Sequence, residues 1–145
     1  MRKLFLFSAG ALALAGCDFA GGSDAAATAP IASLQAANVP AAGWDTDGSA
    51  ADTFFEIQDP SGRSLYRSEI DAAGGTTAAV PAGVAIPSST IGLRVALYDF
   101  DESLRTSTLM ARSAMFTAAQ VSAASSDSTQ FAAESGTASF TVVRR

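Results

Sequence analysis

The chain of 145 residues contains no histidine and only one cysteine. The absence of histidine excludes Ser-His-Asp and Cys-His catalysis, histidine metal ligands and histidine pH switches. A single cysteine can form neither an internal disulfide nor a thiolate zinc site. The net charge of −5 argues against nucleic acid as a partner, because neutralising phosphates requires a basic surface. Hydrophobic residues make up 48% of the chain, which is enough for a buried core, and the length favours one domain.

The N-terminus has the layout of an export signal. Arg2 and Lys3 precede an apolar run over residues 4–15, which is too short for a hydrocarbon core that needs roughly 20 residues. The run ends in Leu14-Ala15-Gly16-Cys17, which resembles the lipobox of bacterial lipoproteins. The resemblance implies cleavage before Cys17 and acylation of that cysteine. The alternative is an uncleaved anchor with an incidental thiol.

These features predict three segments: a lipoprotein signal peptide over residues 1–16, a lipidated Cys17 with a flexible tether over 17–30, and a folded domain over 31–145. The tether is built of small residues, which bury too little surface to offset the entropy of ordering them. Removal of the signal leaves seven arginines against all 14 acidic residues, a net charge of −7. We expect a protein of the bacterial cell envelope, lipid-anchored to a membrane and either periplasmic or surface-exposed.

Short strands separated by turns dominate the domain. We expect strands over 31–39, 53–58, 91–98 and 137–143, and the turn Asp59-Pro60-Ser61-Gly62 predicts a hairpin that returns over 63–70. One short helix is expected after the capping box Thr117-Ala118-Ala119-Gln120, ending near Ala124. This pattern predicts an all-β fold, an antiparallel β-sandwich with at most one short helix.

Acidic residues gather in two stretches. The first comprises Asp45, Asp47, Asp52, Glu56 and Asp59, with no lysine or arginine among them, and the second comprises Asp99, Asp101 and Glu102. The first stretch mostly precedes one expected strand and the second follows another. In antiparallel neighbours such positions share an edge of the sheet, so we expect the carboxylates to converge. Ca²⁺ takes six to eight oxygen ligands in flexible geometry and would remove their mutual repulsion.

Two segments resemble calcium loops of C2 domains. The stretch from Gly43 to Phe55 resembles the first loop of that family, and Leu97-Tyr98-Asp99-Phe100-Asp101 resembles the third. The resemblance implies a C2-like Greek-key sandwich over residues 31–145. It also implies metal ligands at Asp52, at either Asp45 or Asp47, and at Asp99 and Asp101.

The sequence departs from the C2 pattern in its third loop. Thr106 and Ser107 stand where a further acid is expected, so Glu102 or water would have to substitute. Affinity falls as the charge of the ligand set falls. We therefore expect a single Ca²⁺ ion, bound weakly.

Other readings of the same residues stay open. Asp45 to Glu56 has the twelve-residue length of an EF-hand loop, but Gly48 stands at its fourth position rather than the sixth. The acidic residues are also ordinary loop residues that need bind no metal. Trp44, Tyr98 and Phe100 are expected to pack at strand ends, and the arginines to form a solvated or ion-paired surface.

The function expected from the sequence is a calcium-responsive binding or adhesion module on a lipid anchor. Its partners would be the membrane, through lipidated Cys17, and an envelope protein or an anionic surface, through the acidic loops. The alternative is a metal-free scaffold or protein-interaction lipoprotein. We expect that the protein is not an enzyme, because a small sandwich offers little volume for a substrate cleft and the sequence shows no activated nucleophile.

Overall fold

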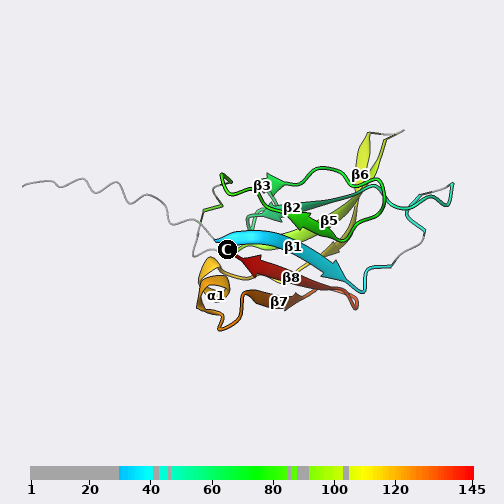
Figure 1. Cartoon of the computed structure of the whole chain (residues 1–145). Coiled ribbons are helices and arrows are strands. Elements are labelled where there is room, and N and C mark those ends of the chain that lie inside the picture. Colours follow the sequence, from blue (N-terminus) through cyan, green and yellow to red (C-terminus); the bar gives the residue numbers. More distant parts are fainter. Residues whose placement is uncertain (1–29, 41–42, 46, 85, 88–91, 103–104) are drawn as a thin grey trace, which may run out of the picture.

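The fold is an antiparallel β-sandwich, as the sequence predicts. The computed structural model describes residues 30–145 except 41–42, 46, 85, 88–91 and 103–104. Two four-stranded sheets and one short helix make up the described part (Figure 1). The elements are β1 (Ile31–Ala37), β2 (Thr53–Gln58), β3 (Ser64–Arg67), β4 (Thr77–Ala79), β5 (Arg94–Asp101), β6 (Thr106–Arg112), α1 (Ala118–Ala123), β7 (Ser128–Ala132) and β8 (Ser139–Arg144).

The chain alternates between the two sheets. One sheet has the strand order β4-β1-β8-β7 and the other β3-β2-β5-β6, and the paired strands are antiparallel. The chain therefore crosses from one sheet to the other after β1, β3, β4 and β6. This interleaved connectivity is that of a Greek-key sandwich rather than of an up-and-down meander.

Period-two side-chain alternation builds the core. Leu93, Val95 and Leu97 share one face of the β5 segment and are at most 1% exposed, as the sequence predicts. Phe140 and Val142 occupy the same role in β8 and are fully buried. Burying each such side chain contributes roughly 1.5–3 kcal/mol, and successive residues of a strand point to opposite faces. The two sheets are held together mainly by these inward rows.

The turn between β2 and β3 forms as predicted. The amide of Gly62 donates to the carbonyl of Asp59 over 2.9 Å, and Gly62 has a φ of +86°, a value that suits glycine because it has no Cβ. The carboxylate of Asp59 accepts hydrogen bonds from the amide and hydroxyl of Ser61 and from the amide of Arg63. Side-chain and backbone chemistry together fix the hairpin.

The helix also begins where the sequence places it. The hydroxyl of Thr117 accepts from the amide of Gln120, and the Gln120 side chain accepts from the amide of Thr117. This reciprocal capping box satisfies two amides that the helix cannot. Ala118 and Val121 face the core.

The two ends of the sandwich differ. At one end β1 begins, and the amide of Arg145 donates to the carbonyl of Pro30 over 2.8 Å. At the opposite end β1 and β5 finish and β2 and β6 begin (Figure 1). We call this second end the distal end.

Three strands were not expected, and one is longer than expected. β4 has only three residues, β6 is rich in hydroxyl side chains, and β7 alternates exposed with half-buried residues, so none carries an apolar strand pattern. β5 continues through Asp101, whereas the sequence places Asp99 and Asp101 in a loop after Tyr98. Hydrogen bonding to β2 and β6 on both sides extends the strand over these polar residues.

The signal-peptide prediction, Cys17 and nearly all of the tether lie outside the described residues. Within the described part, no helix has the length and apolar character required to cross a membrane.

Candidate functional site

Asp52 and Asp99 lie side by side at the distal end. Asp99 is a residue of β5 that pairs with Thr53 of β2, so Asp52 immediately precedes the paired position. The amide of Asp52 donates a 3.1 Å hydrogen bond to Oδ1 of Asp99, and the amide of Phe100 donates to the carbonyl of Asp52 over 2.8 Å. The convergence expected from the sequence is therefore present for this pair.

The position of Asp99 in β5 explains its burial. It lies two residues beyond Leu97 and so on the same, core-facing side of the strand. Asp99 is only 3% exposed. Burial raises the pKa of the Asp99 carboxyl, and the neighbouring charge of Asp45 raises it further, with smaller contributions from Asp52 and Asp101. The hydrogen bond from the Asp52 amide acts in the opposite direction. The net effect is a carboxyl whose ionised form is disfavoured.

The other three predicted metal ligands differ in their relation to Asp99: Asp45 and Asp101 lie within range of its charge, whereas Asp47 is engaged elsewhere. Asp45 is half-buried and close enough for its charge to act on Asp99. Asp101 follows Asp99 on the same face of β5 and acts on it too. Asp47 is exposed, and its carboxylate accepts hydrogen bonds from the hydroxyl and the amide of Ser49. These bonds, the hydroxyl first, lower the pKa of Asp47, so this carboxylate is engaged in its own turn.

The acidic residues at the distal end are of the right chemical type to bind a hard cation, but they are not gathered closely enough to form a ready-made site. The four carboxylates of Asp45, Asp52, Asp99 and Asp101 offer only oxygen, which Ca²⁺ prefers. Among the residues that the structure describes, no group of three or more carboxylates is arranged to hold a metal ion. A cation at this end would therefore need the acidic residues before β2 to move closer to Asp99.

The EF-hand reading of Asp45 to Glu56 does not match the local structure. Glu56 lies inside β2, and its carboxylate accepts a 2.8 Å hydrogen bond from Nε2 of Gln58. A strand therefore occupies the place where an EF-hand needs its second helix.

An apolar pocket adjoins the acidic residues. It measures about 260 Å³ and includes Trp44, Thr53 and Met110 in its lining. Trp44 is half-buried, and its Nε1 donates to the carbonyl of Pro40 over 2.7 Å. The expectation that Trp44 packs at the end of the sandwich agrees with this position. Sequence reasoning missed the pocket, because its walls come from segments without a shared pattern.

Aromatic and cationic side chains cover the outer face of the β3-β2-β5-β6 sheet. Tyr98 stacks on Phe54 with ring centroids 5.2 Å apart, and the guanidinium of Arg67 lies 3.8 Å from the Phe54 centroid. The hydroxyl of Tyr98 accepts from Nε2 of Gln58 over 2.8 Å. Tyr98 is thus a packing residue, as expected, but it lies within β5 rather than at the end of a strand. Phe54 is buried although it points away from the core.

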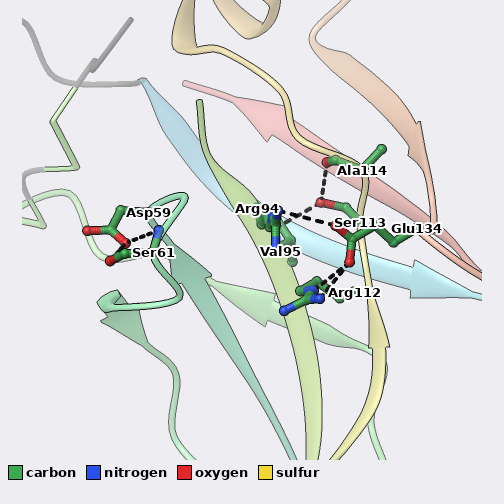
Figure 2. A network of polar contacts seen from close by, with 8 residues as sticks. All are labelled: Asp59, Ser61, Arg94, Val95, Arg112, Ser113, Ala114 and Glu134. Carbon is green, nitrogen blue, oxygen red and sulfur yellow. Dashed lines mark hydrogen bonds and ion pairs between the residues drawn. The ribbon is translucent and has the colours of Figure 1, made fainter. Parts of the chain in front are cut away.

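A second polar network joins β5 and β6 to the residues after β7 (Figure 2). Glu134 pairs with Arg112 over 2.6 Å and with Arg94 over 3.3 Å. Nearby, the buried hydroxyl of Ser113 accepts from the amide of Val95 and donates to the carbonyl of Ala114. These arginines are ion-paired, as expected, and their role is to tie the sheets together.

Comparison with known proteins adds no relative: no family model, no curated protein and no solved structure matches the chain.

Proposed function

We propose that this protein is a lipid-anchored envelope protein whose sandwich is a calcium-responsive binding or adhesion module. The observation that carries the proposal is the burial of Asp99 beside Asp52, in the field of Asp45 and Asp101. A buried carboxylate surrounded by like charges is costly, and a divalent cation removes that cost.

The cation would be held by Asp99 and Asp52, with Asp45 and Asp101 drawn towards it. Asp47 contributes less, because its carboxylate is bound by Ser49. Binding would order the segment before β2 against the end of β5 and present the distal end to a partner. The C2-like character of the domain, the single weakly bound ion and the partner, an envelope protein or an anionic surface, belong to the same proposal.

The position of the acidic residues agrees with an anchor at Cys17. β1 starts at the end of the sandwich opposite the distal end (Figure 1). A chain tethered through the residues before Ile31 would therefore carry its acidic end away from the membrane. Several acyl chains on Cys17 would hold it there without a basic surface, since each buried CH₂ contributes about 0.8 kcal/mol.

Thermal unfolding of the full chain in detergent, with EDTA or with millimolar calcium, tests the proposed cation. A ligand at 100 times its Kd stabilises by about 2.7 kcal/mol. We expect calcium to raise the melting temperature of the unaltered chain and of Asp127→Asn, whose side chain is 93% exposed. Asp99→Asn should abolish the shift. An equal shift in all three chains would refute a site at Asp99.

Incorporation of labelled fatty acid tests the anchor. Label should enter the unaltered chain and be absent from Cys17→Ser. Persistence of label in Cys17→Ser would overturn the processing argument.

The competing function is a metal-free scaffold that displays a sheet face to another envelope protein. The scaffold function is favoured because the described residues contain no group of three or more carboxylates arranged to bind a metal ion. The scaffold predicts that calcium leaves the melting temperature unchanged.

A further inference from the structure

Two turns of the sandwich hold an aspartate by the same hydrogen bonds. In the turn after β2, Oδ1 of Asp59 accepts from the hydroxyl of Ser61 over 2.6 Å and from its amide over 2.9 Å (Figure 2). In the segment before β2, Oδ1 of Asp47 accepts from the hydroxyl and the amide of Ser49 over the same two distances. The serine therefore holds the two carboxylates alike, but the residue between aspartate and serine differs.

The residue that follows an aspartate decides whether its side chain can react with the main chain. A main-chain amide can attack the carboxyl carbon of the preceding aspartate and close a five-membered succinimide ring. Asp59 is followed by proline, which has no N–H to lose, so it cannot react in this way. Asp47 is the only aspartate of the chain that is followed by glycine. Glycine has no Cβ to obstruct the attack.

The surroundings of Asp47 and Gly48 leave room for this reaction. Both residues are exposed. A Cβ built at Gly48 would meet nothing within 4 Å, so no neighbouring side chain shields the amide from that side. The amide of Gly48 donates to the carbonyl of Asp45 over 3.3 Å, which is longer than the usual distance of about 2.9–3.0 Å. The attacking nitrogen is therefore held only weakly.

We propose that Asp47 is a site of spontaneous isomerisation to isoaspartate, and that Ser49 restrains the reaction. The nitrogen of Gly48 bonds to Cγ of Asp47 and gives up its proton. One carboxylate oxygen leaves as water, with that proton and one proton from solvent. Water then opens the ring at either carbonyl, and the solvent proton is returned. Opening at the main-chain carbonyl breaks its bond to the Gly48 nitrogen and leaves the chain linked through Cγ.

The two hydrogen bonds from Ser49 favour the unreacted aspartate. Ring closure turns Cγ towards the Gly48 nitrogen, and Oδ1 moves with it, away from the position in which Ser49 holds it. The bonds also weaken as the ring forms, because a neutral carbonyl is a poorer acceptor than a carboxylate. Ser49 therefore stabilises the starting state more than the ring and slows its formation.

Isomerisation would change the segment that leads into β2. The backbone would pass through Cβ and Cγ of residue 47 and become longer by one carbon, and the former main-chain carboxyl would become the free one. The same segment carries Asp45 and Asp52, so aged protein would differ from fresh protein at the distal end. The reaction itself depends on neither the anchor nor calcium.

Peptide mapping of the aged full chain tests the site. The chain is kept in detergent and EDTA at neutral pH for several weeks, and the isoaspartate at each aspartate is measured. We expect isoaspartate to accumulate at Asp47 and not at Asp59 or at Asp127, whose side chain is 93% exposed. No isoaspartate at Asp47, or as much at Asp127, would overturn the proposal.

Substitution of the serines tests the restraint. Ser49→Ala removes the hydroxyl bond and should speed isomerisation at Asp47 about fivefold, the rate change that corresponds to about 1 kcal/mol. Ser49→Thr keeps a hydroxyl and should retain the rate of the unaltered chain. Ser61→Ala is the matched control, because it removes the same bond from Asp59, and it should leave the rate at Asp47 unchanged. An unchanged rate in Ser49→Ala, or equal acceleration by Ser49→Thr, would contradict a restraint by the hydroxyl.

Discussion

The amide of Asp52 donates a hydrogen bond to the carboxylate of Asp99, which lies 47 residues further along the chain. This bond ties the segment before β2 to the end of β5 at the distal end of the sandwich. The same carboxylate is buried and lies in the field of three further acidic residues. It is therefore the group on which the stability and pH response of this end, and the proposed cation binding, are expected to depend.

Asp99→Asn is expected to stabilise the protein at neutral pH without calcium. The amide side chain keeps an oxygen that can accept from Asp52, and it removes a buried charge. We expect a melting temperature a few degrees higher than that of the unaltered chain, measured by circular dichroism in EDTA. Asp127→Asn is the control and should leave the melting temperature unchanged. A lower melting temperature for Asp99→Asn would contradict a destabilising charge at this position.

The raised pKa of Asp99 should make the contribution of this residue to stability larger at low pH than at high pH. Burial and Asp45 raise the folded-state pKa of Asp99, so the folded state holds the proton over the window between the unfolded and folded values. The contribution of protonated Asp99 is fully present below the unfolded pKa and is lost as pH rises through the folded pKa.

Other carboxyls act in the opposite direction, so a difference measurement is needed. Hydrogen bonds from Ser49 and Ser61 lower the pKa values of Asp47 and Asp59. Their contribution is lost as pH falls through the folded pKa. Urea unfolding of the unaltered chain and of Asp99→Asn at several pH values isolates Asp99. Relative to Asp99→Asn, the unaltered chain should gain stability as the pH falls. A difference that does not vary with pH would refute the assignment.

Glu134→Gln is expected to destabilise the protein by about 1 kcal/mol. Glu134 pairs with both Arg94 and Arg112, and the Arg94 side chain is only 18% exposed. The substitution leaves two partly buried cations without a counter-charge. Asp127→Asn is again the comparison, because its pair with Arg144 is longer, at 3.7 Å, and far more exposed. If urea unfolding showed the same loss of unfolding free energy for Glu134→Gln and Asp127→Asn, the ion pairs of Glu134 would contribute no more to stability than an exposed pair.

Thr117→Ala tests the helix cap. It removes the acceptor for the Gln120 amide and should cost about 1 kcal/mol. Thr117→Ser keeps the hydroxyl and should retain most of the stability. If both substitutions were equally destabilising in thermal unfolding, packing of the threonine methyl rather than capping would explain the loss.

The apolar strands and the turn chemistry were predictable from the sequence. The inward row of β5 has the period-two pattern of a buried strand, and the aromatic and β-branched residues at the centre of β2 favour an extended chain. The turn at Asp59 to Gly62 and the cap at Thr117 are local, so they too could be found from neighbouring residues.

Strands that rely on their neighbours could not be found in this way. β6 has few apolar residues, and it is extended because β5 supplies partners along it on both sides of an irregularity at Met110. The same pairing places Asp99 and Asp101 in the strand β5, whereas the sequence predicts that they lie in a loop. The adjacency of Asp52 and Asp99 was predictable from topology, whereas the engagement of Asp47 by Ser49 depended on the detailed course of the turn.

The most direct test of the account is equilibrium dialysis of the full chain against radioactive calcium. The account predicts saturable binding of one ion per chain, abolished in Asp99→Asn and retained in Asp127→Asn. Absence of saturable binding at millimolar calcium, or binding that survives Asp99→Asn, would contradict it.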